Sequence, residues 1–193
     1  MTTANLLRWW PVIGVLGLLL LGVAVGTDST ALDDRFIEFG HTHPGVDALL
    51  YFTDARLVIL LFLVTIAAAS YRRRWRLAIA AAVTPVVAVV AVRLLKRLFG
   101  REMDGALAYP SGHVTVTVVV LGMAVLVVGV SVWAVTIAVA IAAAGLLGQA
   151  FTYHYFTDTL GAVLLSTALL CIAVRTANLT RVNPSCDLDH SSG

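Results

Sequence analysis

The sequence YPSGH at residues 109–113 determines how the rest of this chain is interpreted. It lies between the long apolar segments 77–95 and 112–128, and a run of cations between residues 93 and 101 precedes it. A second polar segment, YHYFTD at residues 153–158, interrupts the apolar sequence further along the chain. Ionisable groups beside membrane-length apolar segments are costly and commonly functional. These two segments therefore predict a site at the ends of apolar helices.

Composition fixes the class of protein in which this site lies. Of the 193 residues, 60% are hydrophobic and only 12% are charged, and the mean hydropathy is +0.93. Soluble globular domains carry about 25% charged residues, so we expect an integral membrane protein. The net charge of +2, with no basic–aromatic stripe, gives no support to nucleic-acid binding.

Six apolar segments approach or reach the length of about 20 residues that a spanning helix needs. For residues 9–25 the alternative is a secretory signal peptide, because small residues end the segment. Its apolar run is longer than the usual hydrophobic region of about 7–15 residues, which favours a spanning helix. We expect an all-α bundle of six transmembrane helices, forming a single domain over residues 1–182 with a disordered tail at 183–193. The predicted helices cover residues 9–25, 55–71, 77–95, 112–128, 132–152 and 157–174.

The segment from residue 26 to residue 54 is polar by the standards of this chain. Ser29 or Thr30 can cap a short amphipathic helix that continues to Phe39 and lies at the membrane interface. Gly40 and Pro44 are expected to end that helix.

No metal site is expected. Cys171 lies in an apolar segment and Cys186 in the polar tail, so their placement favours neither a disulfide nor a metal-ligand pair. His41 and His43 form a His-x-His pair without a matching third ligand. This pattern favours solvated loop histidines over metal ligands.

The distribution of basic residues predicts the orientation in the membrane. Six spans place both termini on one side, and the basic residues flanking the spans gather there, which by the positive-inside rule makes that side cytoplasmic. The polar loops 26–54, 96–111 and 153–156 then face the extracytoplasmic side together. The basic residues that set this orientation are Arg8, the RRRWR run at 72–76, Arg175 and Arg181.

Several cations nevertheless fall on the outward side, which suggests an anionic ligand. Arg97 is interpreted as a residue whose head extends to the interface, a common fate of basic residues at helix ends. Lys96 and Arg101 are interpreted as groups that neutralise a bound phosphate. Ser111 and Gly112 stand where the next helix begins, and the free amides there favour a phosphate. Ser111 can also act as an N-cap.

Two histidines supply candidates for the chemistry. His113 lies in the first turn of one predicted helix, and His154 lies at the end of another. Histidine suits proton transfer because it titrates near working pH. Asp158 follows His154 by four residues, so in a helical backbone they would share a face and the acid could orient the imidazole for attack.

At these residues the sequence resembles the type 2 phosphatidic acid phosphatase family, membrane relatives of the vanadium haloperoxidases. The PSGH motif of that family stands intact at residues 110–113, and the H-x-x-x-D end of its third motif stands at 154–158. Lys96 with the Gly-Arg pair at 100–101 matches the beginning of its first motif. The segment 34–54 also looks like the loop between the family's first two helices. The resemblance extends over nearly the whole chain in helix order.

Two parts of the family pattern differ in this chain. The first motif expects Arg-Pro where residues 103–104 are Met-Asp, and the third expects Ser-Arg where residues 147–148 are Leu-Gly. Two phosphate-binding arginines are thus absent from their usual places. Arg101 is expected to replace one of them, and Arg93 or Gln149 is a candidate to reach the site.

The resemblance implies a lipid phosphate phosphatase that needs no metal or other cofactor. His154 would be the nucleophile that forms a phosphohistidine, Asp158 would orient it, and His113 would protonate the leaving alkoxide and then activate water. The phosphoryl group would be held by Lys96, Arg101, Ser111 and Gly112. Candidate substrates are phosphatidate, phosphatidylglycerophosphate and polyprenyl carriers, met at the extracytoplasmic face. The alternatives are a lipid phosphotransferase and a homologue that binds or transports lipid without catalysis.

Overall fold

The computed structural model describes residues 3–177, and nearly all of them lie in helices. The predicted disordered tail at 183–193 lies outside the described residues. Within the described range, five helical segments are long and apolar enough to cross a membrane, and a shorter apolar helix accompanies them. The expected all-α membrane bundle is therefore confirmed. The elements are α1 (Thr3–Val25), α2 (Ala31–Thr42), η1 (Val46–Thr53), α3 (Ala55–Tyr71), α4 (Trp75–Phe99), β1 (Glu102–Met103), β2 (Ala106–Leu107), α5 (Gly112–Val128), α6 (Val132–Thr152) and α7 (Phe156–Thr176).

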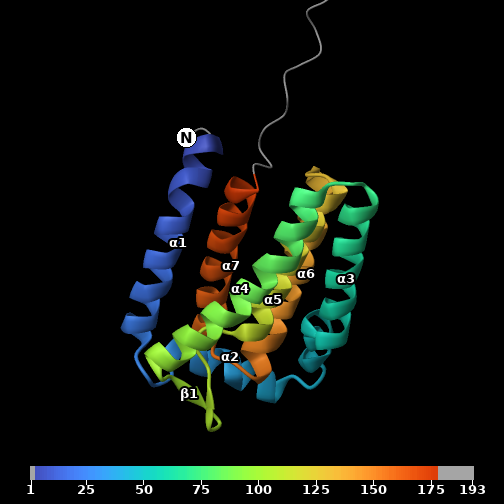
Figure 1. The fold of residues 1–193 in the computed structure, drawn as a ribbon. Helices are drawn as coiled ribbons and strands as arrows, with labels where there is room; N and C mark the ends of the chain where they lie inside the picture. The colour runs from blue at the N-terminus through green and yellow to red at the C-terminus, as the bar shows by residue number, and fades with distance from the viewer. Residues whose placement is uncertain (1–2, 178–193) are drawn as a thin grey trace, which may run out of the picture.

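The long helices run side by side, and the short elements gather at one end of the bundle (Figure 1). Helix α2, the η1 turn and the β1–β2 hairpin lie at that end, whereas the start of α1 and the end of α7 lie at the other. The basic residues mark this second end. Arg175 Nη1 donates to the carbonyl of Arg8 (3.2 Å), and Arg72 Nη1 donates to the carbonyl of Val127 (2.9 Å).

Helix α1 packs closely against α7 as a component of the bundle. Trp10 Nε1 donates to Thr167 Oγ1 over 3.0 Å, and a Cβ at Gly14 would lie only 3.1 Å from the carbonyl oxygen of Leu164. Leu18 is buried in the same core cluster as Tyr109, whose hydroxyl donates to the Leu18 carbonyl. This packing ties the first helix to the loop that carries the PSGH motif.

Helix α2 begins as predicted and ends later. Thr30 caps it through a capping box with Asp33, but the helix continues through Gly40 to Thr42. Gly40 does not end the helix. A glycine is needed at this position because two elements approach closely there: a Cβ would lie 2.0 Å from the carbonyl oxygen of Phe151. Helix α2 is thereby held across the end of α6.

The hairpin between α4 and α5 differs from the loop predicted at 96–111. Strands β1 and β2 pair antiparallel across Asp104 and Gly105, which both have positive φ (52° and 76°). Asp-Gly is a dipeptide typical of a tight hairpin turn. The amide of Ala108 closes the hairpin by donating to the carbonyl of Arg101 (2.7 Å).

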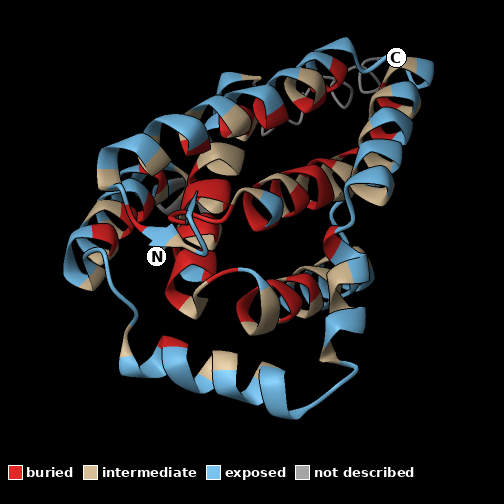
Figure 2. Ribbon diagram, turned by 90° about the horizontal axis from the view of Figure 1, so that it is seen from below, coloured by how far each residue is buried: buried red, intermediate tan, exposed pale blue. Residues whose placement is uncertain are grey.

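Burial follows the arrangement expected of a membrane bundle. Buried positions lie between the helices, and the outward faces are exposed over long stretches (Figure 2). Many of those exposed side chains are large and apolar, as at Leu20, Leu63 and Val139. Such surfaces suit hydrocarbon chains, so the outer face of the bundle is consistent with a lipid environment.

Candidate active site

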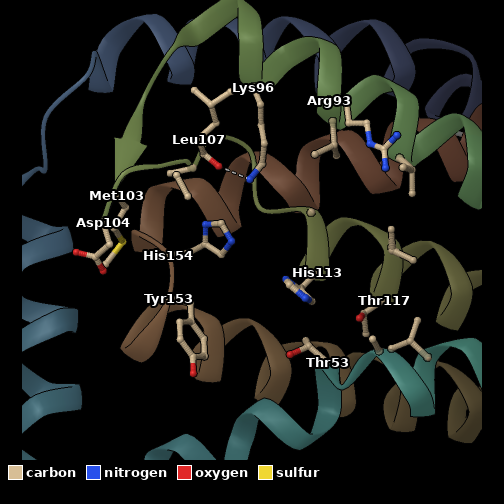
Figure 3. Close-up of a pocket in the computed structure, with 18 of the residues that line it drawn as sticks. Thr53, Arg93, Lys96, Met103, Asp104, Leu107, His113, Thr117, Tyr153 and His154 are labelled. Atoms are coloured by element: carbon tan, nitrogen blue, oxygen red, sulfur yellow. Dashed lines mark hydrogen bonds between the residues drawn. The ribbon is translucent and has the colours of Figure 1, made fainter.

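A cavity of about 880 Å³ is lined in part by the hairpin, the start of α5 and the connection between α6 and α7, at the end of the bundle that carries the short elements. Its walls come from α3, α4, the hairpin, α5 and the connection between α6 and α7. Its polar side chains include Lys96, Arg93, His113 and His154 (Figure 3). Apolar residues from α3 and α4, among them Ile59 and Val89, form much of the remaining wall. A charged end and an apolar wall therefore meet in one cavity.

The two predicted histidines lie in this cavity. His113 extends from the first turn of α5, and His154 extends from the break between α6 and α7, with both rings directed into the cavity (Figure 3). The backbone at His154 is not helical, so the condition under which His154 and Asp158 would share a helix face is not met. The side chains still approach each other, with 3.7 Å between His154 Nδ1 and Asp158 Oδ2.

Asp158 lies behind His154, fully buried in the first turn of α7. Its Oδ1 accepts a hydrogen bond from Arg101 Nη1 (2.7 Å), and its Oδ2 accepts one from the amide of Tyr155 (3.2 Å). These bonds fix the carboxylate with Oδ2 on the side of the imidazole. No hydrogen-bond partner for His154 Nδ1 is found in the described part of the chain, and this carboxylate lies 3.7 Å from it.

Arg101 lies outside the cavity lining. Its side chain is fully buried behind Asp158, where Nη1 also donates to Thr157 Oγ1 (2.7 Å) and Nη2 donates to the carbonyl of Asp28 (2.7 Å). The guanidinium lies over the ring of Tyr155, 4.2 Å from the ring centre. Arg101 is thus buried behind Asp158, whereas Lys96, which the sequence analysis grouped with it, lines the cavity.

Asp33 is the partner that sequence reasoning missed. Its carboxylate in α2 is fully buried and accepts from Arg101 Nη2 (2.9 Å) and from the amide of Thr157 (2.9 Å). Burial raises the pKa of Asp33, but hydrogen bonds from Thr157, Thr30 and Arg101 outweigh this effect and hold that pKa below its usual range. The sequence predicted a helix cap at Ser29 or Thr30, but it gave no sign of a contact between Asp33 and α7.

Lys96 and Arg93 are the cations of the cavity wall. Both extend from the last turns of α4, three residues apart and therefore on one face. Lys96 Nζ donates to the carbonyl of Leu107 in the hairpin (Figure 3). Among residues 3–177, no ion pair of Arg93 is found. Of the two arginines that the sequence analysis proposed for the site, Arg93 lines the cavity and Arg101 does not.

The PSGH motif contributes backbone groups to the candidate site in addition to the His113 side chain. Ser111 is the N-cap residue of α5, but its buried hydroxyl makes no capping bond and has no partner in the described part of the chain. Its amide donates to the carbonyl of Asp158 (3.1 Å), which joins the two motifs directly. Gly112 lines the cavity at the start of the helix.

Thr117 is a cavity residue that sequence reasoning did not single out. Buried threonines elsewhere in the bundle donate to the carbonyl four residues earlier, as Thr115 and Thr84 do (2.7 Å each). Thr117 is equally buried and lines the cavity, but its hydroxyl has no partner among residues 3–177. A hydroxyl left free in this way can bind a ligand.

Gln149, His41 and His43 lie apart from the cavity lining. Gln149 Nε2 donates to Thr53 Oγ1 (2.8 Å), so it supports a wall residue without lining the cavity itself. His43 is exposed and stacks on Phe39, 4.0 Å between ring centres. No group of three or more His, Cys, Asp or Glu suited to holding a metal is present within residues 3–177, and His41 and His43 belong to none.

Comparison with known proteins adds one structural likeness. No family model and no curated protein matches the sequence. A transmembrane PAP2-type phosphatidylglycerolphosphate phosphatase from Bacillus subtilis, known from its crystal structure, is similar with a TM-score of 0.70 at 17% sequence identity. The match covers 92% of this chain and 100% of that one. The likeness agrees with the family resemblance found at the PSGH and H-x-x-x-D motifs. The chain therefore has the fold of a transmembrane PAP2-type phosphatase.

Proposed function

We propose that this protein is a membrane phosphatase that removes a phosphate from a lipid through a phosphohistidine. The observation that carries the proposal is the cavity in which His113, His154 and Lys96 meet an apolar wall. The two histidines and the lysine can carry out the chemistry on the phosphate, and the apolar wall can bind the lipid chain. The shared fold with a PAP2-type phosphatase supports the same reaction class.

The phosphate would bind between α4 and the start of α5. Lys96 neutralises its charge from one side, and the amides at the start of α5 face it from the other, where Gly112 permits a close approach. Ser111 supports this helix start through its backbone bond to Asp158. Arg101 acts behind Asp158 in this proposal, and Arg93 is the second cation that reaches the substrate.

In the first step, the Nε2 lone pair of His154 attacks the phosphorus atom, and the bond from phosphorus to the lipid oxygen breaks. His113, protonated, gives its proton to the departing alkoxide, which leaves as an alcohol. Asp158 stabilises the phosphoimidazolium through Nδ1–H of His154. The present 3.7 Å separation suits this role, because catalytic hydrogen bonds often tighten only when substrate is bound.

In the second step, water replaces the lipid oxygen. His113, now neutral, takes a proton from water, and the resulting hydroxide attacks the phosphorus atom as the P–N bond breaks. The products are inorganic phosphate and free His154, so the proton balance closes without a cofactor. A phosphotransferase would follow the same first step and use an acceptor alcohol in place of water.

The cavity favours a lipid with a second phosphate beyond the scissile one. Arg93 lies three residues inward from Lys96 on α4, a displacement of about 4.5 Å along the helix, and Thr117 lies four residues inward from His113 on α5, a displacement of about 6 Å. A free cation and a free hydroxyl at that depth can bind a phosphodiester or the inner phosphate of a pyrophosphate. Phosphatidylglycerophosphate and polyprenyl pyrophosphates carry such groups, whereas phosphatidate does not.

The cavity is proposed to face the extracytoplasmic side of the cell membrane. Both described chain ends and the RRRWR run lie at the opposite end of the bundle, where the positive-inside rule predicts cytoplasm. Both termini are then cytoplasmic. This orientation fits a role in the turnover of envelope lipids.

Phosphate release from detergent-solubilised lipids tests the proposal. The wild-type protein should release phosphate from at least one of phosphatidate, phosphatidylglycerophosphate and polyprenyl pyrophosphate without added metal. His154→Ala should lower the rate by about 10³-fold or more. His43→Ala, an exposed histidine outside the cavity, should leave it unchanged. Undiminished activity of His154→Ala would refute the mechanism, and lipid binding without phosphate release by the wild type would favour the non-catalytic alternative.

A further inference from the structure

Arg101 is shared between two buried carboxylates that come from distant parts of the chain. Its Nη1 donates to Asp158 Oδ1 over 2.7 Å, and its Nη2 donates to Asp33 Oδ2 over 2.9 Å. All three side chains are fully buried. One cation therefore faces two anions where water cannot screen them, and each acid changes how strongly Arg101 neutralises the other.

Asp33 is held in this position by a complete set of donors. Besides Arg101, its carboxylate accepts from the amide and hydroxyl of Thr157 (2.9 and 3.0 Å) and from the amide and hydroxyl of Thr30 (3.0 and 2.8 Å). Helix α2 is also held by Phe36, which stacks on Phe156 at the start of α7 with 4.1 Å between ring centres. The Asp33 carboxylate is thus held in a fixed position relative to the start of α7, which carries Asp158.

We infer that Asp33 is a positioning residue. Its carboxylate partly neutralises Arg101, so that the negative charge of Asp158 remains available to stabilise a positively charged His154. The inference rests on the proposed phosphatase function. Without Asp33, the whole guanidinium charge would act on Asp158, two atoms from the oxygen that faces His154 Nδ1. The acid would then stabilise a protonated or phosphorylated imidazole less well. Helix α2 would in this way contribute to catalysis without touching the substrate.

Several other charged or titratable groups surround the His154 imidazole. Asp158 faces it from α7, Lys96 from α4 and His113 from α5, and Asp104 of the hairpin lines the same cavity. Tyr153 lies beside it in the connection between the helices. A change at Asp33 leaves all of these groups in place, so its electrostatic effect is transmitted through Arg101 and Asp158.

The pH dependence of kcat/KM for a lipid phosphate tests this inference. In Asp33→Asn, the acid limb of the profile should move to lower pH by about one unit, because the protonated imidazole loses stabilisation. The rate at the optimum should fall about tenfold or more. Asp34→Asn, which alters an exposed neighbour on α2, is the matched control and should leave the profile unchanged.

A second variant separates charge from structure. Thr157→Val removes the hydroxyl that accepts from Arg101 and donates to Asp33 but changes no charge. It should lower the rate while leaving the acid limb in place. An acid limb that moves equally in Thr157→Val and Asp33→Asn, or in neither, would refute the role of Asp33.

Histidine NMR gives a readout that does not depend on turnover. The His154 signal should titrate at lower pH in Asp33→Asn than in the wild type, and a native spectrum in the rest of the protein shows that the variant is folded. If the wild type releases no phosphate but this shift occurs, the proposed function fails and the positioning inference holds. An unchanged His154 titration in a folded Asp33→Asn variant overturns the inference.

Discussion

At the scale of residues, the cations of the site differ in what they can touch. Lys96 and Arg93 line the cavity, whereas Arg101 is buried among carboxylates and Arg97 lies on an exposed part of α4 outside the cavity lining. A group that neutralises a transferring phosphoryl commonly contributes about 10²–10³-fold to the rate. The structure therefore assigns different consequences to cations that stand close together in sequence.

Substitution of these cations by glutamine should follow that division. Lys96→Gln is expected to lower kcat/KM about 100-fold on every lipid phosphate tested. Arg93→Gln should reduce activity on phosphatidylglycerophosphate or a prenyl pyrophosphate by about tenfold, and on phosphatidate by much less, because the second phosphate loses its partner. Arg97→Gln is the matched control on the same helix. Equal losses for Arg93→Gln on all substrates would contradict a second phosphate subsite.

Some residues of the candidate site could be predicted from the sequence, whereas Asp33 and Thr117 could not. His113, His154, Lys96 and Gly112 sit in short motifs whose polarity contrasts with the apolar sequence around them, and all four line the cavity. Asp33 carries no such contrast, because it lies in a segment that contains many other charged residues. Spacing along the chain identifies neighbours within a helix, but it cannot report a carboxylate brought in from another element.

At the scale of elements, helix α2 lies across the end of the bundle that carries the candidate active site. It crosses the end of α6 at Gly40 and contacts the start of α7 through Asp33 and Phe36. His154 lies in the break between those two helices. Any substitution that weakens the packing of α2 against α6 and α7 is therefore expected to disturb the position of His154.

Gly40→Ala tests this link. Its Cβ would lie 2.0 Å from the carbonyl oxygen of Phe151, a backbone atom that cannot move without displacing a helix. Overpacking of this kind costs about 1–3 kcal/mol, so Tm in detergent and phosphatase activity should both fall. Gly17→Ala is the control, because its Cβ would meet only the two methyl groups of Leu164, at 3.4 and 3.9 Å. An unchanged Tm for Gly40→Ala would contradict the close approach of α2.

The short elements could be predicted from the sequence only in part. The start of α2 was predictable from Thr30, but its continuation past Gly40 depends on a contact with α6. Strands β1 and β2 have two residues each, too few for an alternating pattern to be recognised. Only the Asp104-Gly105 dipeptide signalled the turn between them.

At the scale of the whole molecule, the apolar helices could be predicted almost completely. Each predicted span corresponds to one helix, with ends that differ by up to six residues, and the helix that corresponds to 112–128 is shorter than the other spanning segments. The helix α4 extends to Phe99, for example, which places Lys96 inside the helix and not in a loop. The polar end of the bundle depends on contacts between distant segments and required the structure.

Cysteine labelling tests the proposed orientation. With Cys171 and Cys186 replaced by serine, Asp104→Cys at the hairpin turn should react with a membrane-impermeant maleimide in intact cells. Arg73→Cys, in the exposed turn at the opposite end, should react only after permeabilisation. The reverse pattern would place the cavity on the cytoplasmic side.

The central claim is that a phosphoryl group passes through His154, and trapping the phosphoenzyme tests it most directly. In His113→Ala, water activation should slow more than attack by His154 when the substrate has a good leaving group, so the covalent intermediate should accumulate after rapid quenching. Peptide mass spectrometry should find one phosphoryl group on His154, stable in alkali and lost in acid. A phosphoryl group on Ser111, or phosphate release by the wild type through an enzyme that is never phosphorylated, would contradict the proposed mechanism.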